Sequence, residues 1–365
     1  MGSSPQRVLA WADVSLHEVD GWATSWDRPL AGSLDLLVVR SDALADNPLG
    51  DPSLRPLYIY RPPGVDAAAT GRVRLPVVYL LQGFGGRVEN WLAPGSDGPI
   101  TVERLDAMFG AGESAPALLV FVDAWTSRGG SQFLNSTSTG RYLDYVCDEV
   151  VPFVDARYPT LPAREHRGVS GKSSGGYGAL VLSMLRPDLF GALASHAGDT
   201  LFESCYRPLF PVAARMLRDE FGGSWEAFEQ RIEDPGFDWR EYPVLFAAYG
   251  TACAYTPDPQ RPGKALIPFD SLTGRPIDDL WHRWLSLDPV RMAARHVDAL
   301  ASMRRIYIDA GRQDEFFLDL GAMALSVELG RLGIEHSLEL FDGNHDGVDR
   351  RMPAAIADLT RALRR

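Results

Sequence analysis

Short apolar runs recur along the chain and alternate with segments whose apolar residues follow helical spacing. Continuous runs such as residues 77–81 and 117–122 indicate strands that are buried on both faces of a sheet. The predicted strands are residues 33–39, 57–60, 77–81, 117–122, 167–170, 305–309 and 336–341. The predicted helices are residues 100–109, 142–158, 174–185, 319–332 and 353–363. This alternation predicts an α/β fold with a doubly wound, mostly parallel sheet and helices on both faces.

Residues 199–303 interrupt the alternation. They combine short helical patterns, turns rich in proline and glycine, and many aromatic residues, Trp239 and Trp284 among them. We expect this segment to be a helical and loop insertion over the active site, within one domain of residues 1–365. The alternative is an ordinary extension of the core. Residues 1–30 hold three tryptophans among polar residues and are predicted to form an N-terminal arm.

Charge and composition narrow the classes of partner. The 365-residue chain has a formal net charge of −12, which disfavours nucleic acid and anionic membrane surfaces. No run of 18 apolar residues and no leader pattern is present, so we expect a cytoplasmic protein, or a secreted one if a leader has been removed. Three widely spaced cysteines form no zinc motif and predict buried free thiols in a reducing compartment.

The most informative stretch is residues 171–175, which read Gly-Lys-Ser-Ser-Gly and fit the pattern G-x-S-x-G. Between a strand and a helix this pattern forms a nucleophile elbow, where glycines leave room for a sharply turned serine. Ser173 is therefore the predicted nucleophile. Ser170 fails in the same pattern, because Lys172 stands where the second glycine belongs. A phosphate-binding loop is excluded by His166, which stands where that loop needs a glycine.

The order serine, acid, histidine along an α/β-hydrolase chain locates the other two groups. His345 follows the strand 336–341 at its carboxyl end, where catalytic groups gather in open α/β sheets. His336 begins that strand and lies at the wrong end. His345 is the predicted base, and the remaining histidines are expected to be structural or solvated.

Three acidic residues compete for the place after strand 305–309. Asp314 lies in the loop beyond the strand and is the predicted triad acid. Asp309 lies within the strand and is expected to support the site or fix a loop. Glu315 is expected to be solvated.

An oxyanion hole requires backbone N–H groups directed at the developing alkoxide. Ser174 follows the nucleophile and supplies the first predicted donor. The loop 82–86, Gln-Gly-Phe-Gly-Gly, lets the main chain approach a substrate closely, and Phe84 is the second predicted donor. This loop fails as a dinucleotide-binding fingerprint, because Val88 replaces the third glycine.

Taken together, these motifs resemble the putative-esterase branch of the α/β-hydrolases, which includes esterase D-like enzymes, feruloyl esterases and the mycobacterial trehalose mycolyltransferases. The similar stretches are residues 57–63, 77–91, 149–154, 171–180, 186–191, 309–314 and 343–345. The resemblance implies an α/β-hydrolase fold and places the family's five catalytic groups on Ser173, Asp314, His345, Phe84 and Ser174. This chain departs from the family in two places, where Gln82 replaces a common His and Ser174 a common Met.

These residues predict a serine carboxylic-ester hydrolase that forms an acyl-enzyme, with a small-molecule ester as substrate and no metal or cofactor. One alternative is acyl transfer to a sugar or lipid hydroxyl by the same triad. Another is a non-catalytic binding protein on a hydrolase fold. The sequence identifies neither the ester nor the oligomeric state.

Overall fold

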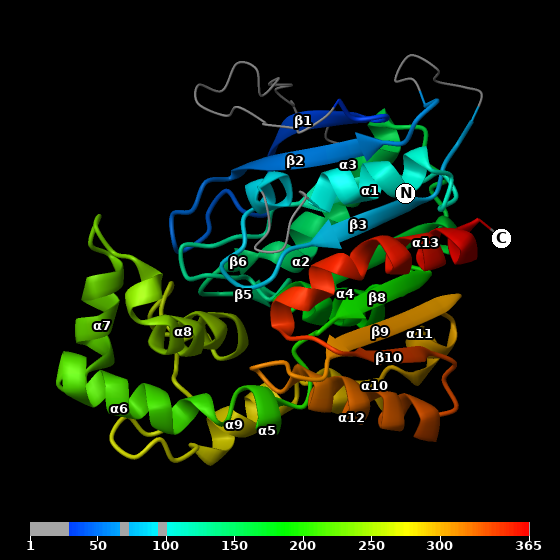
Figure 1. Ribbon diagram of the computed structural model, residues 1–365. Helices are drawn as coiled ribbons and strands as arrows, with labels where there is room; N and C mark the ends of the chain where they lie inside the picture. Colours follow the sequence, from blue (N-terminus) through cyan, green and yellow to red (C-terminus); the bar gives the residue numbers. More distant parts are fainter. Residues whose placement is uncertain (1–28, 66–72, 94–100, 365) are drawn as a thin grey trace, which may run out of the picture.

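A mixed, mostly parallel sheet runs through the molecule (Figure 1). The computed structural model describes residues 29–65, 73–93 and 101–364. In these residues eight strands pair in the order β1-β2-β4-β3-β7-β8-β9-β10. β2 is antiparallel to both β1 and β4, and all other neighbours are parallel. The strands are β1 (Ser33–Arg40), β2 (Leu54–Arg61), β3 (Val77–Leu81), β4 (Leu118–Val122), β7 (Arg167–Lys172), β8 (Ala192–His196), β9 (Arg305–Gly311) and β10 (Ser337–Phe341).

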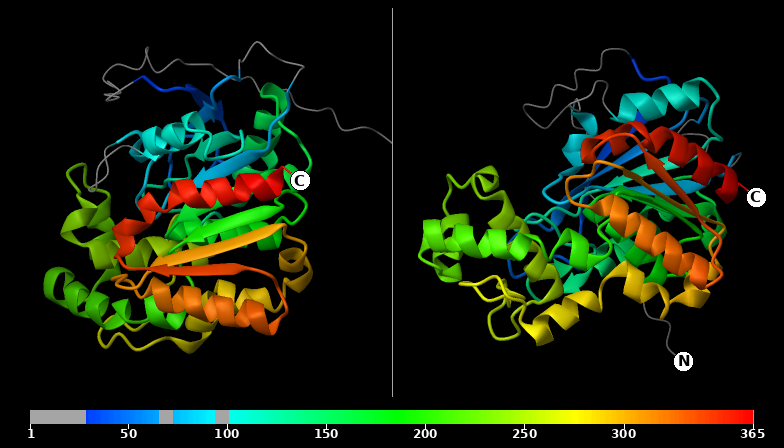
Figure 2. Two further views of the ribbon diagram at one scale, coloured as in Figure 1. Left: turned by 45° about the vertical axis from the view of Figure 1, so that its right-hand side comes forward. Right: turned by 60° about the horizontal axis from the view of Figure 1, so that its bottom comes forward.

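Helices cover both faces of the sheet (Figure 2). On one face, α1 (Thr101–Gly110) and α13 (Met352–Leu363) share a buried apolar cluster with alternate residues of the central strands. On the other face lie α3 (Val151–Arg157), α4 (Ser174–Leu185) and α12 (Leu318–Arg331).

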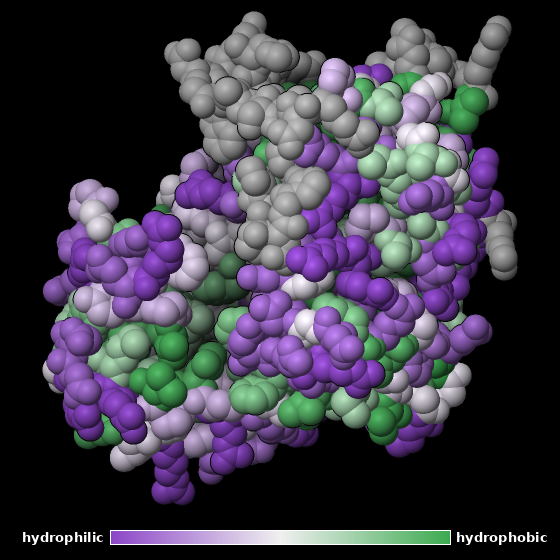
Figure 3. Space-filling view, in the orientation of Figure 1, coloured by the Kyte–Doolittle hydropathy of each residue, from purple (hydrophilic) through white to green (hydrophobic). Residues whose placement is uncertain are grey.

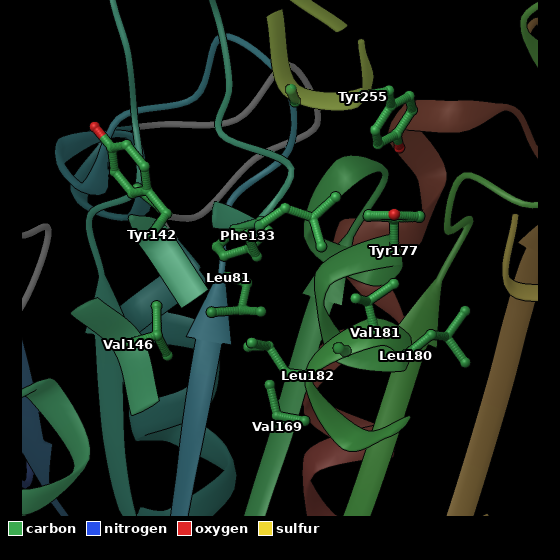
Figure 4. Packing of buried hydrophobic residues seen from close by; sticks show 14 of the residues in the cluster. Leu81, Phe133, Tyr142, Val146, Val169, Tyr177, Leu180, Val181, Leu182 and Tyr255 are labelled. Atoms are coloured by element: carbon green, nitrogen blue, oxygen red, sulfur yellow. The ribbon is translucent and has the colours of Figure 1, made fainter. Parts of the chain in front are cut away.

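The helix α4 is apolar around its whole circumference because it is enclosed on all sides. In Figure 4 its residue Leu182 lies beside Leu81 of β3 and Val169 of β7. The helix that follows the predicted nucleophile is thus anchored in the main core.

The segment between β8 and β9 forms seven α-helices and one 3₁₀ helix, Trp239–Glu241. The α-helices are α5 (Phe202–Cys205), α6 (Leu209–Phe221), α7 (Trp225–Ile232), α8 (Pro243–Tyr255), α9 (Asp278–Leu285), α10 (Pro289–Ala293) and α11 (Val297–Ala301). Helices α6, α7 and α8 form a lobe beside the sheet (Figures 1 and 2). Most aromatic residues of the segment are buried against one another, as Trp284 is with Tyr206 and Tyr255. Trp239 is an exception at 42% exposed.

Two features differ from the sequence-based expectations. β8 was not predicted, and the helix expected over residues 142–158 contains a π-helical stretch, Tyr145–Val150, between α2 (Tyr142–Asp144) and α3. Its apolar residues recur every four positions, a spacing that drifts around a regular helix of 3.6 residues per turn. The wider π turn keeps Tyr142, Val146, Val150 and Val154 buried on one side.

Other expectations concern single features of the chain. The predicted arm of residues 1–30 falls almost entirely outside the described residues. All three cysteines are buried free thiols, as predicted. None of the helices in the described ranges has the length and apolar character needed to cross a lipid bilayer.

Candidate active site

Ser173 occupies the sharp turn between β7 and α4. Its backbone has φ 57° and ψ −126°, which an L-residue adopts only when the surroundings enforce it. The Ser173 N–H donates to the carbonyl of His196 at 2.8 Å, and its carbonyl accepts from the Tyr177 N–H at 2.9 Å. The elbow predicted from residues 171–175 is therefore present, with strand and helix on either side.

The two glycines of the motif are required because the surrounding backbone leaves no space for a side chain. A Cβ on Gly171 would lie 2.3 Å from the backbone of Gly175, and a Cβ on Gly175 would lie 2.2 Å from the carbonyl oxygen of Leu81. Both distances are far inside van der Waals contact, so no larger residue fits without moving β3 or the elbow.

Asp314 and His345 meet beside this elbow. His345 Nδ1 lies 2.8 Å from Asp314 Oδ2, and the Asp314 side chain is fully buried while that of His345 is 13% exposed. Asp314 Oδ1 accepts the N–H of Phe316 at 2.9 Å, which fixes the carboxylate. The Phe316 ring contacts the imidazole edge-on, with centroids 5.0 Å apart. The pair leaves Nε2 of His345 available for a second partner.

The competing acids have other partners. Glu315 accepts the backbone N–H of His345 at 3.1 Å, and such backbone hydrogen bonds lower the pKa of its carboxyl. Asp309 is fully buried on β9 and pairs with His196 Nδ1 at 2.8 Å. Since the carbonyl of His196 holds the Ser173 N–H, this pair lies directly behind the elbow.

A cavity of about 470 Å³ joins these groups. Ser173 and His345 both line it, although no hydrogen bond joins them among the described residues. Phe84 and Ser174 line it as well. Figure 3 shows the recess between the lobe and the body that carries the sheet, with apolar residues inside it.

The two predicted oxyanion donors come from separate segments. Ser174 is the first residue of α4, where backbone N–H groups have no partner within the helix. The Phe84 loop is held by a hydrogen bond from the Gly85 N–H to the Gly129 carbonyl, 2.8 Å long. Gly83 packs so closely on the elbow that a Cβ there would lie 3.1 Å from Ser173 Cβ. The loop and the nucleophile are thus in direct contact.

Lys172 connects the elbow to the segment that carries His345. Its ammonium group lies 3.2 Å from Asp349 Oδ1 and 3.7 Å from Asp346 Oδ1. Both acids belong to the 3₁₀ segment His345–Arg350. This role of Lys172 was not predicted, because its spacing from the two acids along the chain gives no signal.

A buried carboxyl, Asp199, also lines the cavity and was missed by the sequence analysis. Its Oδ2 accepts hydrogen bonds from the hydroxyls of Ser174 at 2.8 Å and Tyr206 at 2.7 Å, and from Gln132 Nε2 at 3.3 Å. Burial raises the pKa of Asp199 above its ordinary value, although these donors oppose the shift. The signal was its position just after β8, which was itself not predicted.

Backbone strain is concentrated around the cavity. Six non-glycine residues in the described ranges have positive φ: Gln132, Phe133, Ser173, Ala197, Leu201 and Phe317. Gln132 contacts Asp199, Ala197 and Leu201 flank it at two residues' distance, and Phe317 lies between two residues of the cavity wall. Strain of this kind persists only where packing enforces it, and it gathers at functional sites.

The groups present are suited to acyl transfer on a nucleophilic serine: a strained serine, an oriented imidazole and backbone donors. In the described residues, no group of three or more His, Cys, Asp or Glu side chains is arranged to hold a metal ion.

Comparison with known proteins gives one family. The family described as "Putative esterase" matches residues 53–346. A curated protein of Xylanibacter ruminicola, named endo-1,4-beta-xylanase/feruloyl esterase, is 25% identical over 143 residues, which are 39% of this chain and 19% of that protein. The chain therefore spans about a fifth of the length of that curated relative.

Solved structures share the fold. A ferulic acid esterase aligns with a TM-score of 0.58 and 15% identity, over 92% of this chain and 100% of that one. The fluorophosphonate-binding serine hydrolase F of Staphylococcus aureus aligns at 0.55 and 16%, over 90% and 98%. An S-formylglutathione hydrolase of Agrobacterium tumefaciens aligns at 0.54 and 16%, over 92% and 97%. These likenesses confirm the predicted α/β-hydrolase fold.

Proposed function

This chain belongs to the family described as "Putative esterase" and is an esterase, and we propose that it hydrolyses small-molecule carboxylic esters through a triad of Ser173, His345 and Asp314. The observation that carries the proposal is the 2.8 Å contact between Asp314 and His345, in a cavity onto which the strained Ser173 opens.

In the proposed mechanism, Ser173 Oγ attacks the ester carbonyl while His345 Nε2 takes its proton. Asp314 holds the imidazole by Nδ1–H and stabilises its charged form. The N–H groups of Ser174 and Phe84 stabilise the alkoxide, each by about 3–4 kcal/mol. His345 gives its proton to the departing alcohol, and then activates the water that releases the acid from Ser173.

Residues 199–303 act as a cap in this proposal, inserted within a single domain. The support is that Trp239, Ala247 and Thr251 of this segment line the same cavity as Ser173. Trp239 and Phe316 are partly exposed at the cavity, at 42% and 49%. Such rings favour an ester with an apolar or aromatic portion.

The test is the hydrolysis of nitrophenyl acetate together with labelling by a fluorophosphonate probe. Ser173→Ala should lower kcat/KM about a thousandfold or more and abolish labelling, because no other group can form the acyl-enzyme. Ser170→Ala is the matched control, since Ser170 is buried in β7 and does not line the cavity. Full activity in Ser173→Ala would contradict the proposal.

A further inference from the structure

Asp199 has no part in the chemistry proposed above, yet it is a buried carboxyl on the cavity wall. We propose that Asp199 binds a hydroxyl group carried by the ester, so that the enzyme selects hydroxylated esters over their plain analogues. This inference rests on the proposed function, because it assigns the substrate class of the same cavity.

The two oxygens of Asp199 have different environments. Oδ2 accepts three hydrogen bonds, from Ser174, Tyr206 and Gln132. Oδ1 accepts none from any described residue, and it is not among the fully enclosed atoms that lack a partner. Since Asp199 lines the cavity, Oδ1 is the oxygen that a bound molecule meets.

The cavity that Asp199 lines has a largely apolar wall. Cys205, Leu209, Ala247 and Leu318 contribute to it. A single polar group in an apolar pocket orients a ligand, and it costs free energy whenever it is left unpaired. A substrate hydroxyl satisfies Asp199 in either protonation state, because it can donate to a carboxylate or accept from a carboxylic acid.

The carboxyl is held in place by its supports. Gln132, one of its donors, and Ala197 and Leu201 on either side of it all have positive φ, so the backbone around Asp199 is strained. Gln132 Nε2 also lies 3.2 Å from the hydroxyls of Tyr206 and Tyr255, which ties the network to α8. Figure 4 shows Tyr255 above α4, beside Tyr177. A carboxyl so fixed can discriminate between substrates.

The contact between Asp199 and Ser174 places the carboxyl near the ester carbonyl that reacts. Ser174 donates its hydroxyl to Asp199, and its N–H is a proposed oxyanion donor. The bound hydroxyl should therefore lie within a few bonds of the ester carbonyl, on the acyl or the alcohol side.

Two pairs of esters test the inference. On the acyl side, 4-nitrophenyl 3-hydroxybutyrate is compared with 4-nitrophenyl butyrate. On the alcohol side, 2-hydroxyethyl butyrate is compared with propyl butyrate. In at least one of the two pairs, kcat/KM should be about 10- to 100-fold higher for the hydroxylated ester. This is the range expected for a hydrogen bond to a charged or buried acceptor. Ratios within about twofold of one in both pairs would overturn the inference.

Variants then assign the preference to Asp199. Asp199→Ala should bring the ratio to about one, and Asp199→Asn should lower it. The matched control is Asp106→Asn, because Asp106 is also a buried carboxyl that accepts a tyrosine hydroxyl, that of Tyr60, but it lies on α1 and does not line the cavity. A ratio that stays at the wild-type value in Asp199→Ala overturns the inference. If circular dichroism shows that Asp199→Ala does not fold, an unchanged ratio in Asp199→Asn overturns the inference instead.

The two proposals fail in different ways. If Ser173 takes up a fluorophosphonate probe and plain butyrate esters are hydrolysed without a hydroxyl preference, only the role of Asp199 is wrong. If Ser173 is not labelled, the proposed triad itself is wrong.

Discussion

Ser173 carries a backbone conformation that serine rarely adopts, and its neighbours make that conformation possible. Gly171 and Gly175 pack backbone to backbone, and Gly175 also packs on the carbonyl of Leu81. The strain at Ser173 is held by hydrogen bonds to His196 and Tyr177. The identity of a residue two positions away from the serine therefore decides where its hydroxyl points.

Replacing Gly175 by Ala should disturb both folding and activity. The new Cβ would meet the Leu81 carbonyl oxygen at 2.2 Å, so β3 or the elbow must shift. We expect the free energy of unfolding to fall by about 1–3 kcal/mol, as for other overpacked cores, and kcat to fall with it. Urea denaturation and nitrophenyl ester kinetics measure the two effects.

Gly330→Ala is the control for this substitution. Gly330 lies in α12 with open space around the added carbon, so alanine should leave kcat unchanged and stabilise the helix by up to about 1 kcal/mol. Equal losses in both variants would contradict the steric explanation.

At the scale of elements, strands and helices of strong pattern could be predicted from the sequence. β3 matches its prediction because its five apolar residues are all buried, and α4 matches because its start is set by the elbow. β8 was missed because residues 192–196 are Ala-Leu-Ala-Ser-His, without a β-branched or aromatic residue to indicate a strand.

The missed strand explains what the site prediction lacked. Asp314 and His345 were selected from their order and placement along the chain, and in the structure a hydrogen bond joins their side chains. His196 is the last residue of β8, and Asp199 follows that strand. Without β8, Asp199 could not be placed on the cavity wall, nor His196 behind the elbow. Contacts such as Lys172 with Asp349 depend on tertiary packing that no local pattern records.

The ion pairs of Lys172 join two elements, the end of β7 and the 3₁₀ segment that begins at His345. Lys172→Met should loosen the position of His345 and lower kcat about two- to fivefold, the range expected for a partly exposed ion pair. Raising the salt concentration should lower kcat of the wild type towards that of the variant, because salt screens the ion pairs. It should leave kcat of the variant unchanged. Steady-state kinetics at low and high ionic strength measure both effects.

Lys264→Met is the matched control, since Lys264 pairs with Glu229 and Glu233 in the helical segment and does not line the cavity. Lys172→Arg should keep most of the activity because the charge is retained. A salt response that is the same in Lys172→Met and the wild type would argue against this coupling.

For the molecule as a whole, buried acids connect folding to pH. Burial raises the pKa of Asp199 in the folded state. The folded protein then holds its proton more tightly than the unfolded chain, whose carboxyl titrates near about 3.9. The contribution of Asp199 to stability is thus fully present below that value and is lost as pH rises through the folded pKa.

The comparison with Asp199→Asn isolates this contribution. As pH rises from 4 to 8, the free energy of unfolding of the wild type should fall relative to that of the variant, by up to about 1.4 kcal/mol per pH unit while the proton is being lost. Urea denaturation at each pH measures the difference.

Asp270→Asn should change in the opposite direction. Hydrogen bonds from Thr273 lower the pKa of Asp270, so its stabilising effect is present at neutral pH and lost as pH falls. A wild-type advantage over Asp199→Asn that is constant with pH would contradict the assignment of a raised pKa.

The strained backbone around the cavity sets a boundary for engineering this protein. Each non-glycine residue at positive φ costs about 1–3 kcal/mol. The described ranges contain six such residues, among them Ser173 on the cavity wall and three that contact or flank Asp199. Together their cost is comparable to the whole free energy of unfolding of a natural protein, which is about 5–15 kcal/mol. Glycine would relieve this strain, but at Phe133 it would also remove a buried ring worth about 3–5 kcal/mol, and at Gln132 it would remove a donor to Asp199. Thermostable variants of this enzyme should be sought in its distant helices.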